Sequence, residues 1–274
     1  MSILELLSYP FMQRALLAGI MLAALLASLG IFVTVRKMAF FGDGIAHSTL
    51  AGLAIAILSG LSPLPVALVW AVIVALLIWW LEHKTRLSSD TLIGILFTAS
   101  MALGVLLMSF SHGYQPELVS FLFGSILAIR ALDLVYIMIV GTLILVWLIS
   151  SFRQLAYMSL SEDQAAVSGV PVKRQTILLY IALAMATVLG VKMLGIILVS
   201  ALLILPAATS RMVIRTFRSH IAMSIVLAEI MVAVGLAISF HYDLPSGATI
   251  ILVGTALFFL AAIVKPFVGR IIKN

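Results

Sequence analysis

Long apolar runs, broken by short polar segments, take up most of this chain and limit what it can fold into. They lie at about 15–35, 44–59, 63–81, 91–111, 118–129, 132–150, 175–191, 193–210, 220–240 and 247–264. A helix needs about 20 apolar residues to cross the ~30 Å hydrocarbon core of a bilayer. Because the runs are continuously apolar rather than alternating, they favour helices over barrel strands. We therefore predict an all-α, polytopic membrane helical bundle of about nine transmembrane helices, in one domain over residues 1–274.

The run at 118–129 is shorter than the others and cannot cross a bilayer as a helix. We predict that it forms a re-entrant or interfacial segment.

Composition excludes several classes of protein. Hydrophobic residues make up 64% of the chain and charged residues only 9%, against roughly 45–50% and 25% in soluble domains. The segments outside the apolar runs are too short for a soluble catalytic domain. Since the chain has no cysteine, disulfides, thiolate metal sites and thiol catalysis are excluded as well.

The positions of Lys and Arg predict the orientation in the membrane, because cytoplasmic loops carry an excess of these residues. With nine spans and the N-terminus outside, only Arg14, Arg130 and Lys192 of the 16 Lys and Arg residues lie on the outer side. The C-terminus is then cytoplasmic. This topology accounts for the net charge of +6, and we expect no nucleic-acid partner.

Two ionisable residues, Asp43 and His47, lie at the start of the apolar run at 44–59 and are four positions apart in the stretch MAFFGDGIAHSTLAGLA. On a helix they share a face, and a carboxylate beside an imidazole suits Zn²⁺, Mn²⁺ or Fe²⁺. Two ligands leave the coordination shell of the metal ion incomplete. This suits a path along which the ion crosses the membrane, because an ion held too tightly does not leave. The alternative is an Asp–His hydrogen bond that stabilises a buried helix.

Three further features concern the membrane interior. Glu229 is a candidate third metal ligand, or it is partnered by a hydroxyl group such as that of Ser224 or Thr209. Pro206 removes a backbone donor and predicts a kink or break that lines a cavity. Gly42 and Gly44 flank Asp43 and predict local unwinding there.

The polar stretch 151–175 contains the start and stop signals of a short helix at about 161–170. Ser161 is a good N-cap, and the helix dipole favours acidic residues in the first turn. Gly169 fits a C-terminal cap and Pro171 prevents continuation. Glu162 and Asp163 are the acidic residues in question. A helix this short needs packing to persist, so it is either a contact for a soluble partner or a surface turn.

Six segments of the chain, taken in order, resemble a known family. They are KMAFFGDGIAHSTLAG, LSSDTLIGILF, SFLFGSILAI, LSEDQAAVSGVPV, GIILVSALLILPAATSR and DLPSGATIILV. They lie between Lys37 and Val253. Together they resemble the permease subunit of the ABC importers for zinc, manganese and iron, the ABC-3 family, and the resemblance extends over roughly residues 11–265.

The resemblance implies a type II ABC importer fold and a homodimer in the cytoplasmic (inner) membrane of a prokaryote. It further implies two ATP-binding cassette subunits on the cytoplasmic side and an extracytoplasmic metal-binding protein that delivers the ion. The helix at about 161–170 resembles the coupling helix of the family, and the GDxxxH motif corresponds to Asp43 and His47. We expect no enzyme activity and no permanently bound cofactor, because the chain has no GxxxxGK[ST] motif and the partner subunits would use the ATP.

Zn²⁺ is the first choice of substrate, because the aromatic residues before Gly-Asp in MAFFGDGIAHSTLAG resemble zinc-type members. Mn²⁺ and Fe²⁺ are alternatives, since the same donors accept them. A proton-coupled secondary carrier could use Asp43, His47 and Glu229 as a proton relay. An intramembrane metal-dependent hydrolase would need a motif such as HExxH, which the chain lacks. A permease for a chelated metal is a further alternative, but its path would not need a coordinating pair such as Asp43 and His47.

Overall fold

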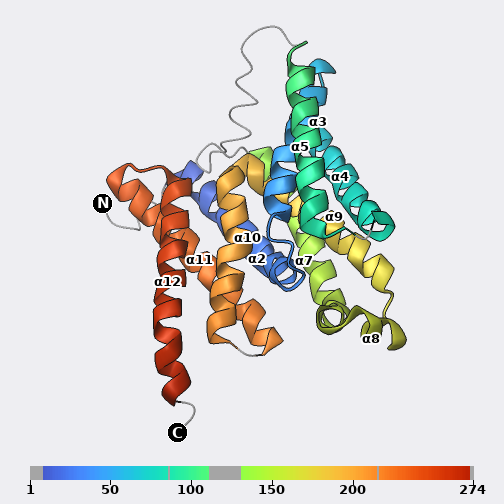
Figure 1. Cartoon of the computed structure of the whole chain (residues 1–274). Helices are drawn as coiled ribbons and strands as arrows, with labels where there is room; N and C mark the ends of the chain where they lie inside the picture. The colour runs from blue at the N-terminus through green and yellow to red at the C-terminus, as the bar shows by residue number, and fades with distance from the viewer. Residues whose placement is uncertain (1–8, 86, 111–130, 215, 272–274) are drawn as a thin grey trace.

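The computed structural model describes residues 9–85, 87–110, 131–214 and 216–271, and this part of the chain consists of helices joined by short turns, without strands (Figure 1). The helices are α2 (Pro10–Val35), α3 (Phe41–Leu58), α4 (Pro63–Thr85), α5 (Ser89–Met108), α7 (Ala131–Leu160), α8 (Glu162–Val167), α9 (Val172–Leu194), α10 (Ile196–Val213), α11 (Phe217–Tyr242) and α12 (Ser246–Ile271).

The predicted number of spans is confirmed. Nine helices in the described residues are long and apolar enough to cross a membrane, and α8 is the short exception. The segment 118–129, predicted to be re-entrant or interfacial, lies outside the described residues.

The spans differ in how deeply they are buried. Most residues of α2, α3 and α9 are buried, whereas most residues of α5, α7 and α12 are at least partly exposed. The centre of the bundle is formed where α2 packs against α10 and α11, and where α3 packs against α4 and α5. An added Cβ at Gly30 would lie 1.8 Å from the carbonyl oxygen of Leu203. Glycine is therefore required where α2 crosses α10, as is common between membrane helices.

The two expected helix breaks are not found. Gly42 and Gly44 lie inside the first turn of α3, and α10 continues through Pro206 from Ile196 to Val213. The glycines allow close packing instead, since an added Cβ would lie 2.8 Å from Leu203 Cδ1 at Gly42 and 2.3 Å from Ile93 Cγ2 at Gly44. Proline is tolerated inside membrane helices because neighbouring groups satisfy the freed backbone carbonyl.

The stretch 151–175 is also more helical than its polarity suggests. Residues 151–160 continue α7 instead of forming a loop. Ser151, Leu155 and Met158 are buried at helical spacing, so this segment is an amphipathic extension of the membrane span. It carries α8 directly at its end (Figure 1).

Candidate metal pathway and coupling site

The helix α3 is buried except for one stripe that contains both candidate metal ligands. From Phe41 to Ala54, every residue is buried except Asp43, His47 and Leu50, which are part exposed. Their spacing places them on one face of the helix. The structure thus brings the two predicted ligands together on the face of α3 that the described chain leaves partly open.

The carboxylate of Asp43 is held from a second helix. Ser200 Oγ, on α10, donates a hydrogen bond to Asp43 Oδ1. Asp43 also lies in the first turn of α3, where the helix dipole stabilises a negative charge. Its other oxygen, Oδ2, has no hydrogen-bond partner among the residues that the structure describes. The side chain is oriented by one contact and retains an oxygen that can bind a cation.

The imidazole of His47 contacts α5 rather than Asp43. Its ring lies 5.2 Å from the ring of Phe97, centroid to centroid, at an interplanar angle of 64°. In the described part of the chain neither ring nitrogen has a hydrogen-bond partner. The Asp–His hydrogen bond considered as the alternative role of this pair is therefore not formed.

Glu229 is half-buried in α11 and is not gathered with Asp43 and His47, since the described residues contain no group of three His, Cys, Asp or Glu side chains that could hold a metal ion. The two hydroxyl groups considered as its partners are used elsewhere. Ser224 donates to the carbonyl oxygen of Ala27 at 3.2 Å, and Thr209 donates to that of Leu205 at 2.7 Å.

The short helix predicted after the polar stretch is present as α8. Ser161 Oγ accepts a hydrogen bond from the backbone N–H of Gln164 at 3.3 Å, as expected for an N-cap. Glu162 and Asp163 lie in its first turn. Gly169 has φ of +81°, which reverses the chain after the helix, and Pro171 is the N-cap residue of α9.

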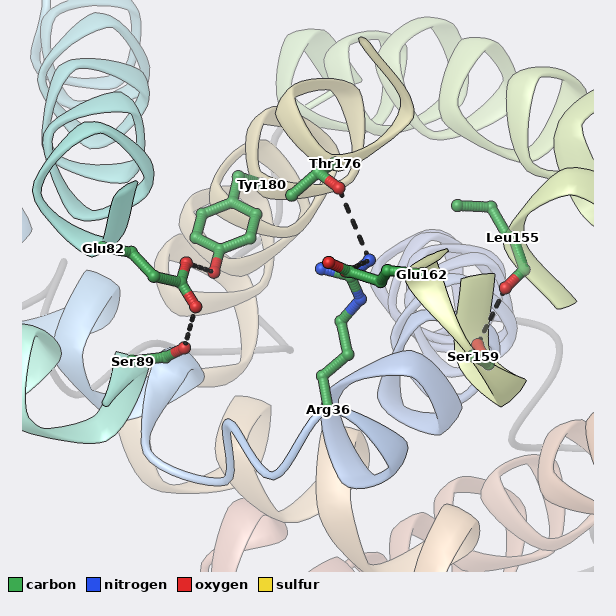
Figure 2. Close-up of polar contacts among 8 residues, drawn as sticks. All are labelled: Arg36, Glu82, Ser89, Leu155, Ser159, Glu162, Thr176 and Tyr180. Carbon is green, nitrogen blue, oxygen red and sulfur yellow. Dashed lines mark hydrogen bonds and ion pairs between the residues drawn. The ribbon is translucent and has the colours of Figure 1, made fainter. Parts of the chain in front are cut away.

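One arginine connects α8 to the centre of the bundle. Arg36, which caps the C-terminus of α2, forms an ion pair with Glu162 at 2.8 Å between Nη2 and Oε1. The same nitrogen lies 3.4 Å from Thr176 Oγ1 at the start of α9. Figure 2 shows the guanidinium of Arg36 between these two side chains. Because only a short turn separates Arg36 from α3, the ion pair links α8 to the helix that carries Asp43.

A second polar cluster lies beside Arg36. Glu82, near the end of α4, accepts hydrogen bonds from Ser89 Oγ and from the hydroxyl group of Tyr180, each at 2.6 Å (Figure 2). These contacts join α4, α5 and α9 at the end of the bundle where α8 lies. Arg36, Glu82, Ser89 and Glu162 all line one cavity of about 330 Å³.

Sequence reasoning missed Ser200, Arg36, Glu82 and Tyr180 as members of these sites. From the sequence, Arg36 is only one of the basic residues that predict the orientation in the membrane. The other three residues fall in or beside apolar runs. Their partners come from distant parts of the chain. The one available signal was that a polar residue within a span needs a partner.

Comparison with known proteins places these features in a family. A model of the ABC 3 transport family, ABC-3, matches residues 8–265. The chain is 36% identical over 253 residues to the high-affinity zinc uptake system membrane protein ZnuB of Haemophilus influenzae, covering 92% of this chain and 97% of that protein.

Similarity to manganese transport proteins is almost as high. The chain is 35% identical over 265 residues to the manganese transport system membrane protein MntC of Halalkalibacterium halodurans, covering 97% of this chain and 91% of that protein. Among solved structures, PsaBC from Streptococcus pneumoniae in complex with Fab matches with a TM-score of 0.82 and 30% identity. That match covers 94% of this chain and 93% of the other.

Proposed function

Because this chain belongs to the ABC 3 transport family and is a metal-ion importer permease, we propose that it passes Zn²⁺ across a prokaryotic cell membrane. The observation that carries the proposal is the part-exposed stripe of α3 with Asp43 and His47. A carboxylate and an imidazole with unused donor atoms can bind a transition-metal ion briefly. Their incomplete set of ligands allows the ion to leave again.

Zn²⁺, Mn²⁺ and Fe²⁺ all accept a carboxylate and an imidazole, and Zn²⁺ is proposed over Mn²⁺ because imidazole is a preferred ligand of Zn²⁺, whereas Mn²⁺ favours oxygen ligands. The relatives named for zinc and for manganese are almost equally similar to this chain. The choice therefore depends on the donor atoms and needs a competition measurement.

A second copy of the chain would complete the site. Each copy contributes two ligands on a part-exposed face of α3, and zinc sites commonly take four. We therefore place the path between two copies, with the stripes of α3 facing each other. Glu229 as a further ligand stays a separate prediction, in which Glu229→Gln changes the preference among metals without impairing folding.

The energy for transport would come from two ATP-binding cassette subunits that contact α8 on the cytoplasmic side. Movement of α8 would act through Glu162 on Arg36, and from there on the short turn that precedes α3. An extracytoplasmic metal-binding protein would deliver the ion to the opposite side, with the N-terminus of the chain outside. The contacts of Arg36 support ATP-driven transport over a proton-coupled carrier. A proton-coupled carrier has no ATPase, so a contact that holds α8 to the bundle would have no function in it.

The test is uptake of radioactive Zn²⁺ into proteoliposomes that contain this chain, its co-encoded ATPase and its binding protein. We expect ATP-dependent uptake that is lost in His47→Ala, and weak competition by Mn²⁺ and Fe²⁺. Uptake that does not require ATP would favour a secondary carrier. Inhibition of uptake by Mn²⁺ at concentrations well below that of Zn²⁺ would indicate that Mn²⁺ is the substrate, and the proposed importer function would still hold.

A further inference from the structure

A groove of about 550 Å³ lies between the last turns of α7 and the start of α11. It is lined by Phe152, Arg153, Ala156, Tyr157, Leu160, Thr216, Phe217, Arg218 and Ser219. Since α8 directly follows α7, the groove lies at the end of the bundle where α8 is found (Figure 1). The metal path and the coupling contacts use none of these residues.

The groove carries positive charge that the described residues do not neutralise. Arg153 and Arg218 are both exposed, and neither has an ion-pair or hydrogen-bond partner among the described residues. The described lining residues include no acidic side chain. The first turn of α11 is likewise without an acidic residue, and Thr216 forms no side-chain cap there. An anion in the groove would meet two guanidinium groups and no opposing charge.

Apart from Thr216 and Ser219, the remainder of the lining is apolar or aromatic. The rings of Phe152 and Phe217 bridge the two helices at a centroid distance of 5.7 Å. Tyr157 and Leu160 are exposed, the latter to 84%. Such a lining suits a ligand that has an apolar part next to its anionic group, rather than a fully hydrated anion.

Each arginine stands at the end of an apolar stripe along its membrane span. On α7, the residues preceding Arg153 on the same face are exposed and apolar, and the same holds for those following Arg218 on α11. These stripes consist of Ile139, Leu143, Val146 and Ile149 on α7 and of Ala222, Val226 and Ile230 on α11. Apolar faces of membrane spans that the chain leaves uncovered suit acyl chains, and arginine at their end suits the headgroup level.

We propose that this groove binds an anionic phospholipid, whose phosphate is held by Arg153 and Arg218 and whose acyl chains lie along the exposed stripes of α7 and α11. Guanidinium groups bind phosphate oxygens through charge-assisted hydrogen bonds. Basic pockets between membrane helices on the cytoplasmic side are typical sites for acidic headgroups. The lipid would anchor the end of α7 that carries α8, next to the coupling contacts.

Native mass spectrometry of the permease in complex with its ATPase tests the proposal, with equimolar phosphatidylglycerol and phosphatidylethanolamine supplied in detergent. We expect the wild type to retain phosphatidylglycerol in preference. Arg153→Gln with Arg218→Gln should reduce that retention about thirty-fold, since each cation near a headgroup contributes about a fivefold preference. Phosphatidylethanolamine retention should not change. The matched control is Lys84→Gln with Arg174→Gln, which removes two exposed charges outside the groove.

Unchanged retention in the groove variant, or an equal loss in the control, would overturn the proposal. Displacement of the lipid by millimolar inorganic phosphate would indicate a free-anion site instead. Retention of the lipid by the permease alone but not by its complex with the ATPase would also overturn the proposal, because the groove would then be a contact for the ATPase. If the double glutamine variant fails to fold, Arg153→Lys with Arg218→Lys keeps the charge and should retain at least a third of the lipid, and complete loss in that variant would contradict the proposal.

Discussion

The two ends of the segment that joins α2 to α3 differ sharply in how their polar groups are used. At one end, Arg36 bonds to Glu162 and Thr176, which connects three helices. At the other, among the residues that the structure describes, Asp43 has one side-chain hydrogen bond, to Ser200, and the imidazole of His47 has only a ring contact, with Phe97. The proposed coupling end is therefore held by side-chain contacts, whereas the proposed path end keeps donor atoms that no described residue binds.

This difference matches what each end must do in a transporter. A group that transmits movement needs fixed partners, because displacement of one side chain then displaces the next. A group that binds an ion in transit needs free donor atoms and must release the ion again. Substitutions at the two ends should therefore fail in different ways, one in uptake itself and the other in the ATP used per ion.

The largest effect is expected at the path end. Asp43→Ala removes the carboxylate from the exposed stripe of α3 and should lower Zn²⁺ uptake more than about 100-fold, since loss even of a supporting group around a metal costs 10–100-fold. Assembly with the ATPase and basal ATP hydrolysis should persist. Uptake in proteoliposomes, with ATPase activity measured on the same samples, checks this.

Ser48→Ala is the matched control, because Ser48 lies on α3 as well but is buried and donates to the carbonyl oxygen of Ile45 at 2.8 Å. It should leave uptake nearly unchanged. Loss of assembly in Asp43→Ala would assign Asp43 a structural role and remove the contrast between the two ends.

A smaller effect is expected from Ser200, which orients Asp43. Ser200→Ala deletes a hydrogen bond to a charged group, a contact that contributes about 1.5 kcal/mol. The KM for Zn²⁺ should rise about tenfold with little change in the maximal rate. The control is Thr209→Ala, because the hydroxyl group of Thr209, also on α10, bonds among the described residues only to its own helix, at the carbonyl oxygen of Leu205. Equal effects of the two substitutions would contradict a specific role for Ser200.

Only part of the candidate site could be predicted from the sequence. Asp43, His47 and the N-cap Ser161 were predicted because helical spacing and capping are local properties. The partners were not, because they lie far along the chain. Ser200 is 157 positions from Asp43, and Glu162 is 126 positions from Arg36.

The unwinding expected at Gly42 and Gly44 was wrong for a related reason, and of the kink or break expected at Pro206 the break is not found. Glycine and proline favour breaks in isolated helices, but packing decides the outcome here. At Gly42 the absence of a side chain lets α10 approach α3 closely. This close packing occurs with Gly42 inside a regular helix. Tertiary contacts of this kind have no signature in one sequence.

At the coupling end we expect a moderate effect that can be reversed. Arg36→Glu or Glu162→Arg alone should raise the number of ATP molecules hydrolysed per ion about fivefold, because a half-exposed ion pair contributes only about 1 kcal/mol. The double variant Arg36→Glu with Glu162→Arg restores opposite charges and should recover much of the coupling. Simultaneous measurement of Zn²⁺ uptake and phosphate release gives this ratio.

Lys173→Glu is the control for charge alone, since Lys173 is exposed near the same end of the bundle and lies over the ring of Trp79. The effect of Lys173→Glu on the ATP used per ion should be the same in the wild type and in the Glu162→Arg variant. If the double variant at Arg36 and Glu162 is no better than the single variants, the ion pair does not transmit movement.

The smallest effect is expected at Gly169, which ends α8 with φ of +81°. A Cβ there would meet no atom of the described residues within 4 Å, so backbone strain of about 1–2 kcal/mol is what opposes a side chain there. Gly169→Val should destabilise the turn after α8 and raise the ATP used per ion two- to threefold, whereas Gly169→Asn should be almost neutral because asparagine tolerates this conformation. Hydrogen exchange of the α8 amides, measured beside the coupling ratio, should show faster exchange only in the valine variant. If both variants uncouple equally, the cause is the side chain itself, which points to direct contact between Gly169 and the ATPase rather than to strain.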